Sequence, residues 1–167
     1  WEQILEAEDL LKNLKIDDTI CALATGGGKS AIAVIRISGP NALKITNTIF
    51  SKDLSKYNTH SIVYGNILFK NEIIDEVLIS KFNNNKSYTG EQTIEISCHG
   101  SIYIQKRILE LLIDSGCRLA NPGEFTLRAF KNGKLDLSQA ESVAELIAAE
   151  SKAEQKTAIN HLKGGFS

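Results

Sequence analysis

The sequence has few cysteines, no long apolar run and almost no net charge, and each shortage excludes a class of protein. The cysteines, Cys21, Cys98 and Cys117, are an odd number without C-x-x-C spacing. This argues against a disulfide framework and against a zinc site, and it fits a reducing compartment, so we expect a cytoplasmic protein. No apolar run has the length of a membrane span, and the first residues do not have the pattern of a signal peptide.

The formal net charge of −1 gives no global field that would draw the chain to nucleic acid or to an anionic membrane. Any RNA contact would therefore be local, or be made by another part of the protein. Hydrophobic residues make up 43% of the 167 residues and charged residues 23%, which is ordinary for a globular protein. The length suits one domain with an appended arm.

Apolar spacing along the chain predicts an α+β domain followed by a helical arm. Alternating or β-branched runs predict strands at 18–24, 31–38, 61–69, 74–82 and 92–98. Helical spacing predicts helices at 40–50, 101–115, in a short piece from 124, and from 137 toward 161. Asp136 and Gln139 have the spacing of a capping box at the start of the last helix. Glu124 and Arg128 are expected to pair at i,i+4.

Residues 1–15 also have apolar side chains at helical spacing and predict a short amphipathic helix. The chain begins with Trp1 rather than Met. We therefore expect residues 1–16 to be a separate segment, of processing or expression-vector origin.

The segment from Gly26 to Ser30, GGGKS, looks like the end of a phosphate-binding P-loop. A P-loop also requires a glycine at position 23, which is Leu23, and a helix after the serine. The next residues, AIAVIRIS, predict a strand instead. A glycine turn between two strands is the better interpretation.

Three polar residues have both a structural and a functional interpretation. Arg36 lies in an apolar strand, so its guanidinium must meet a carboxylate or a ligand, or lie on a wet face. Glu95 lies on the polar side of an alternating strand; the ordinary interpretation is a solvated face, although a carboxylate also suits an amino-pyrimidine edge. Lys134, after an Asn-Gly turn, is by itself a surface lysine.

The pair Cys98-His99 does not predict a nucleophile and its base, because adjacent strand residues point to opposite faces. Cys98 is expected in the core and His99 at a strand end. His60 and His161 are expected on the surface, and no metal ligand set is predicted.

Four segments together resemble one family, the tRNA uridine-5-carboxymethylaminomethyl modification GTPases known as MnmE or TrmE. They are DTICALAT from Asp18, AIAVIRISGP from Ala31, SYTGEQTIEISCHG from Ser87, and NPGEFTLRAFKNGKLDLSQAESVAELI from Asn121. They occur in the family's order and at its distances. The chain departs from the family in the turn at 26–30 and at Ser101, where a second glycine is usual.

The resemblance implies a tetrahydrofolate-binding domain with the fold of aminomethyltransferases at residues 17–134, which pairs with its twin in a homodimer. It also implies the first long helix of a helical domain at 135–167, with the GTPase domain that the family inserts there absent from this sequence. We therefore expect the stretch alone to lack GTPase activity and to carry no catalytic residue.

Residue by residue, the family's folate-binding positions fall on Arg36, Glu95 and Lys134, with 5-formyltetrahydrofolate as the expected cofactor. GTP, Mg²⁺ and K⁺ would belong to the absent domain. The implied reaction modifies carbon 5 of the wobble uridine (U34) of tRNA, with a flavin-containing partner of the MnmG or GidA type. The alternatives are a dimerisation scaffold without folate binding, and a stand-alone folate-dependent aminomethyltransferase, which would need a longer chain.

Overall fold

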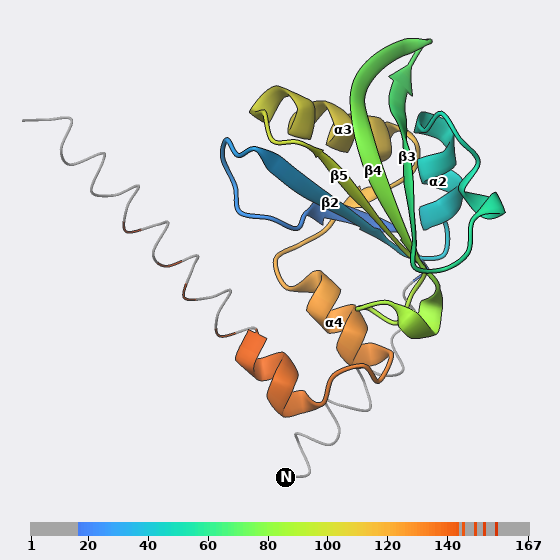
Figure 1. The fold of residues 1–167 in the computed structure, drawn as a ribbon. Helices are drawn as coiled ribbons and strands as arrows, with labels where there is room; N and C mark the ends of the chain where they lie inside the picture. The colour runs from blue at the N-terminus through green and yellow to red at the C-terminus, as the bar shows by residue number, and fades with distance from the viewer. Residues whose placement is uncertain (1–16, 144, 146–148, 150–151, 153–155, 157–167) are drawn as a thin grey trace, which may run out of the picture.

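The computed structural model describes residues 17–143, 145, 149, 152 and 156. Its described part is built around one β-sheet. Its six strands have the order β3-β4-β5-β2-β1-β6 (Figure 1). Neighbours are antiparallel, except that β6 runs parallel to β1. The strands are β1 Ile20–Leu23, β2 Ile32–Ser38, β3 Ser61–Phe69, β4 Glu72–Phe82, β5 Thr93–His99 and β6 Arg118–Leu119.

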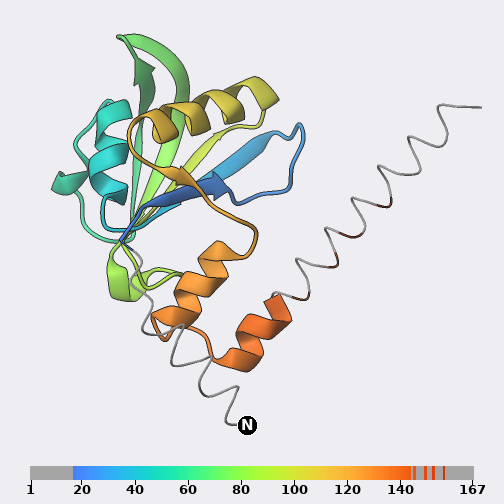
Figure 2. The same ribbon diagram turned by 180° about the vertical axis from the view of Figure 1, so that it is seen from behind.

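Two helices, α2 (Ala42–Ile49) and α3 (Ile102–Asp114), pack on one face of the sheet and on each other. A third helix, α4 (Glu124–Lys131), lies beyond one end of the sheet, below it in Figure 2. Short 3₁₀ turns occur at Leu54–Lys56 and Asn84–Lys86. No helix in the described ranges has the length and apolar character to cross a membrane.

The core lies between the sheet and helices α2 and α3. Because strand side chains alternate in direction, every second residue of the central strands enters it. The fully or nearly fully buried residues include Ile35, Ile37, Val77, Ile79, Ile94, Ile96, Ile45, Ile49, Ile108 and Leu112. The β-branched side chains favour the central strands, and the apolar residues at helical spacing give α2 and α3 one face to bury.

The opposite side of the sheet, which we call the open face, carries exposed apolar side chains. Ile32, Tyr64 and Leu78 are 65%, 55% and 46% exposed. Strand register places Arg36 and Glu95 on this same face, next to one another on β2 and β5. The sequence therefore builds a sheet with one packed face and one face available for binding.

The mixture of a sheet and helices is confirmed, and the strands and helices within residues 17–131 match the predicted ones to within a few residues. The capping box is also confirmed: Asp136 Oδ1 accepts from the Gln139 amide at 2.8 Å, and Gln139 Oε1 accepts from the Asp136 amide at 3.0 Å. Strand β6 was not predicted, because its two residues carry no pattern of their own. The predicted helix at 1–15 and most of the helix from 137 to 161 lie outside the described residues.

Candidate functional site

The site begins with an ion pair on the open face. Arg36 and Glu95 are direct neighbours in the β2–β5 register, and Arg36 Nε donates to Glu95 Oε1 at 3.1 Å. The side chains are 23% and 27% exposed, so the pair is partly desolvated. Within the described part of the chain, neither Nη atom of Arg36 nor Oε2 of Glu95 has a hydrogen-bond partner. The pair thus presents free donors beside a free acceptor.

A hollow of about 480 Å³ opens next to Arg36, between the end of β1 and the start of α4. Apolar side chains, three hydroxyl-bearing side chains, the Arg36 guanidinium and glycine backbone line it. The lining residues are Leu23, Ala24, Thr25, Gly26, Arg36, Tyr88, Gly123, Phe125 and Thr126. Glu95 does not line the hollow and is connected to it through its hydrogen bond with Arg36.

Two aromatic rings flank the guanidinium. The Cζ atom of Arg36 lies 5.1 Å from the ring centre of Tyr88 and 5.3 Å from that of Phe125. Both distances are within the range of cation–π attraction. The hydroxyl oxygens of Tyr88 and Thr126 are 3.1 Å apart, which joins the loop before β5 to α4. Neither aromatic residue was named as a candidate from the sequence.

Lys134 lies apart from this pair. Its Nζ donates to the carbonyl oxygen of Asn85, in the 3₁₀ turn at Asn84–Lys86. A Cβ placed on Gly90 would come within 3.4 Å of Lys134 Cγ, so the lysine stem lies against that loop. The structure therefore brings Arg36 and Glu95 together and places Lys134 on the loop that leads to Tyr88.

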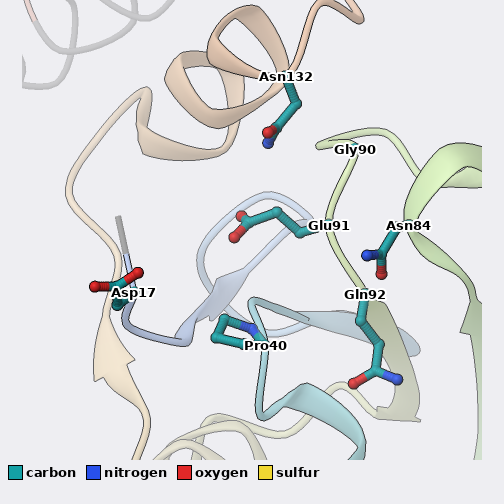
Figure 3. A pocket seen from close by; sticks show the side chains of 7 residues that line it. All are labelled: Asp17, Pro40, Asn84, Gly90, Glu91, Gln92 and Asn132. Carbon is teal, nitrogen blue, oxygen red and sulfur yellow. The ribbon is translucent and has the colours of Figure 1, made fainter. Parts of the chain in front are cut away.

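A second hollow, of about 500 Å³, lies near this loop. Its lining is Asp17, Pro40, Asn84, Gly90, Glu91, Gln92 and Asn132. Figure 3 shows Glu91 at its centre, with the side chain of Asn132 directed toward it. The Glu91 carboxylate already accepts from Ser38 and Arg128, and Asn132 donates to the carbonyls of Thr89 and Arg128. The hydrogen bonds of Glu91 and Asn132 thus go to residues outside the lining of this hollow.

An ionic cluster holds α4 against the sheet. Arg128 is 1% exposed and pairs with Asp18, Glu91 and Glu124, and Arg118 pairs with Asp18 and Glu124. The predicted Glu124–Arg128 pair is confirmed, at 3.4 Å. Hydrogen bonds from Arg118 hold the pKa values of Asp18 and Glu124 below their usual range. The cluster fixes the position of the helix that carries Phe125 and Thr126.

Comparison with known proteins now identifies the family. The sequence profile of the family described as GTP-binding protein TrmE N-terminus matches residues 19–134. The chain belongs to this family. It is 56% identical over 154 residues to the tRNA modification GTPase MnmE of Flavobacterium johnsoniae, and 52% identical over 155 residues to that of Porphyromonas gingivalis. Each match covers 90% of this chain and 33% of the relative, so the chain spans about a third of the length of these curated relatives.

The glycine segment of this TrmE family member does not form a P-loop. Strand β2, not a helix, follows it from Ile32. No heavy atom would lie within 4 Å of a Cβ on Gly26, Gly27 or Gly28, and Gly28 has φ +97°, which favours glycine. The interpretation as a turn between strands is confirmed.

The cysteines of this TrmE family member are free and buried. Burial raises the pKa of Cys98 to about 11, so at neutral pH this thiol stays protonated and is a poor nucleophile. His99 points away from it: His99 Nδ1 lies 2.7 Å from Oδ1 of the buried Asp75, whose other oxygen accepts from the His99 amide. A core cysteine beside a strand-end histidine is therefore confirmed. Asp75, 24 residues away, was not predicted as the partner.

Proposed function

We propose that this chain is the folate-binding, dimerising part of a tRNA-modifying GTPase, with the aminomethyltransferase-like domain at residues 17–134 and the start of a helical domain at 135–167. The observation that carries the proposal is the Arg36–Glu95 pair, with unpaired donor and acceptor atoms beside a hollow with aromatic walls. Family membership supports it, because the relatives are named as tRNA modification GTPases.

The chemistry of the pair suits the amino-oxo-pyrimidine edge of a folate. Glu95 Oε2 can accept N–H bonds from that edge, while the Arg36 Nη groups can donate to its carbonyl oxygen. The Tyr88 and Phe125 rings provide flat apolar surface for the ring system. 5-Formyltetrahydrofolate supplies a one-carbon unit; the residues here bind and orient it.

Lys134 is proposed to meet a carboxylate of the folate tail. Its ammonium group already lies on the loop that carries Tyr88, through its bond to Asn85. To meet a ligand bound at Arg36, Lys134 Nζ would leave the Asn85 carbonyl oxygen and bond to a ligand carboxylate instead. A bond between two charged groups is stronger than the exposed bond to a carbonyl, so the exchange favours the bound state. A lysine on a flexible stem can make that exchange.

For the whole protein we propose modification of carbon 5 of the wobble uridine (U34) of tRNA in the cytoplasm, together with a flavin-containing partner of the MnmG or GidA type. GTP, Mg²⁺ and K⁺ would be bound by a GTPase domain outside this sequence. A second copy of the chain would dimerise with this one, and the exposed Ile32, Tyr64 and Leu78 of the open face support a self-association surface.

Calorimetric titration with 5-formyltetrahydrofolate tests the proposal. The 167-residue chain should bind saturably, and Glu95→Gln should weaken binding by about 10- to 100-fold, because hydrogen bonds to a charged group are lost. Glu110→Gln is the matched control, since Glu110 is an exposed partner of Arg107 on α3. It should bind like the parent.

Failure of the folded parent to bind would refute folate binding by this chain. If light scattering in the same samples still shows a dimer, the scaffold alternative is favoured.

A further inference from the structure

A further hollow, of about 220 Å³, lies on the open face, and Arg36 does not line it. Its lining is Ile32, Tyr64, Glu76, Val77, Leu78, Ser97, Cys98 and His99. Leu78 lies opposite Ser97 in the β4–β5 register. Because every second side chain of a strand shares a face, Glu76 and His99 are the next residues beyond this pair on the same face. A carboxylate and an imidazole therefore lie at one end of a hollow with apolar walls.

A buried carboxylate orients the imidazole. Asp75 is 7% exposed, and its Oδ1 atom lies 2.7 Å from His99 Nδ1. An ionised carboxylate only accepts hydrogen bonds, so Nδ1 carries the proton and Nε2 is left with a free lone pair. Nothing in the described part of the chain bonds to Nε2, and the His99 side chain is 67% exposed. Burying a carboxylate costs free energy, and here that carboxylate holds an exposed histidine in one orientation.

The neighbouring carboxylate is oriented as well. The Tyr64 hydroxyl bonds to Glu76, and this bond raises the pKa of Tyr64. A histidine whose second ring nitrogen is held by a carboxylate is the usual form of a zinc ligand, and carboxylate oxygens are common ligands beside it. Imidazole favours Zn²⁺ over Mg²⁺ or Ca²⁺, which take oxygen ligands. Glu76 and His99 thus have the chemistry of two zinc ligands in one hollow.

We propose that Glu76 and His99 form half of a zinc site, which a second copy of the chain completes. Within the described residues no group of three or more His, Cys, Asp or Glu side chains is placed to hold a metal ion, so one chain supplies two ligands. Structural zinc takes four ligands, and two chains related by a two-fold axis supply two histidines and two glutamates. The cation also offsets the repulsion between the two Glu76 carboxylates at the axis.

The surroundings of the hollow fit a contact between two copies. Ile32, Tyr64 and Leu78 line it and are 65%, 55% and 46% exposed, so a second copy would bury apolar surface around the metal. The inference rests on self-association through the open face, which is part of the proposed function, and adds the ion that regulates it. A metal ion that only the dimer holds stabilises the dimer by mass action.

Titration calorimetry and sedimentation velocity test the proposal on the untagged 167-residue chain. We expect one Zn²⁺ to bind per two chains. Zinc should lower the dimer dissociation constant about tenfold or more relative to EDTA, because the metal binds the dimer in preference to the monomer. Mg²⁺ should change neither measurement, since it prefers an octahedral set of oxygen ligands.

Variants identify the ligands. His99→Ala and Glu76→Gln should each abolish the response of the dimer to zinc. Asp75→Asn keeps both ligands but removes the carboxylate that holds His99, so zinc affinity should fall about 10- to 100-fold. His60→Asn is the matched control and should respond like the parent, because His60 packs on Phe82 and does not line the hollow. Thermal unfolding in EDTA checks that each variant is folded.

The outcomes separate this inference from the proposed function. No zinc binding by the folded parent, one Zn²⁺ per chain without a change in association, or an undiminished response in His99→Ala and Glu76→Gln would each overturn it. Folate binding, and dimerisation in EDTA, would then still stand on their own measurements. A parent that stays monomeric in both zinc and EDTA overturns the inference together with self-association through the open face.

Discussion

At the scale of the residue, Arg128 is a charged side chain that is almost completely buried. Its side chain is 1% exposed and its Nε atom is buried without a hydrogen-bond partner. A buried guanidinium is tolerated only when carboxylates surround it, and Asp18, Glu91 and Glu124 do so. Two of these partners are 37 and 110 residues away, so only Glu124 could be found from spacing.

We predict that Arg128→Met lowers the free energy of unfolding by about 3 kcal/mol, because it removes a partner from the partly buried Glu91 and from the buried Glu124. Urea unfolding followed by circular dichroism measures the change. Arg107→Met is the control: its pair with Glu110 is weak, and methionine keeps an apolar contact with the Phe69 ring beside it, so the loss should stay below about 1 kcal/mol. Equal losses in the two variants would contradict this account of Arg128.

At the scale of the element, α3 shows how local sequence sets both ends of a helix. Ser101 Oγ accepts from the Ile104 amide at 3.1 Å, which caps the first turn. At the other end Gly116 has φ +117°, and the Cys117 amide donates to Leu112 O in the pattern of a Schellman motif. The predicted helix, with Gly116 as its stop, is therefore confirmed.

Ser101→Ala should destabilise the protein by about 1 kcal/mol, because an N-terminal amide of α3 loses its acceptor. In thermal unfolding this corresponds to a melting point lower by about 2–4 °C. Ser115→Ala, at the other end of α3, is the control and should change the melting point little, since the capping bond there comes from its backbone. A melting point unchanged by Ser101→Ala would show that the cap contributes nothing.

At the scale of the whole molecule, the ionic cluster connects α4 to β6, to Asp18 before β1 and to Glu91 before β5, and it has a predictable pH dependence. The folded-state pKa values of Asp18 and Glu124 are lowered, with the hydrogen bonds from Arg118 as the largest cause. A lowered pKa means that the unfolded state binds protons more readily. The stabilisation is thus complete above the unfolded pKa values of about 4 and is lost as the pH falls through the lower folded values.

We therefore expect the free energy of unfolding, measured in urea, to fall steadily as the pH is lowered from about 5 toward 2. Glu124→Gln should be less stable than the parent at pH 7 and should lose less stability on acidification, so the two curves converge at low pH. The exposed Glu110→Gln should keep the parent's slope. Parallel curves for the parent and Glu124→Gln would exclude this carboxylate as a source of the acid sensitivity.

The sequence by itself determined where the strands and helices lie and which residues are candidates for the binding site. Alternating isoleucines at Ile94 and Ile96 define a strand with a buried face, and a capping serine and a following glycine define α3, because these preferences depend on neighbours along the chain. Motif resemblance singled out Arg36, Glu95 and Lys134. Their positions in the sequence do not show which of the three side chains are in contact in the folded protein.

Only the tertiary structure decided which distant residues meet. Arg36 and Glu95 are 59 residues apart and pair because β2 and β5 are adjacent in one register. Tyr88 and Phe125 flank the Arg36 guanidinium because α4 folds back against the loop before β5. Strand order and register are set by burying the sheet's apolar face as a whole, and a shift of one residue would turn Arg36 into the core. No local pattern carries that information, so the hollow and its aromatic walls became visible only in the folded chain.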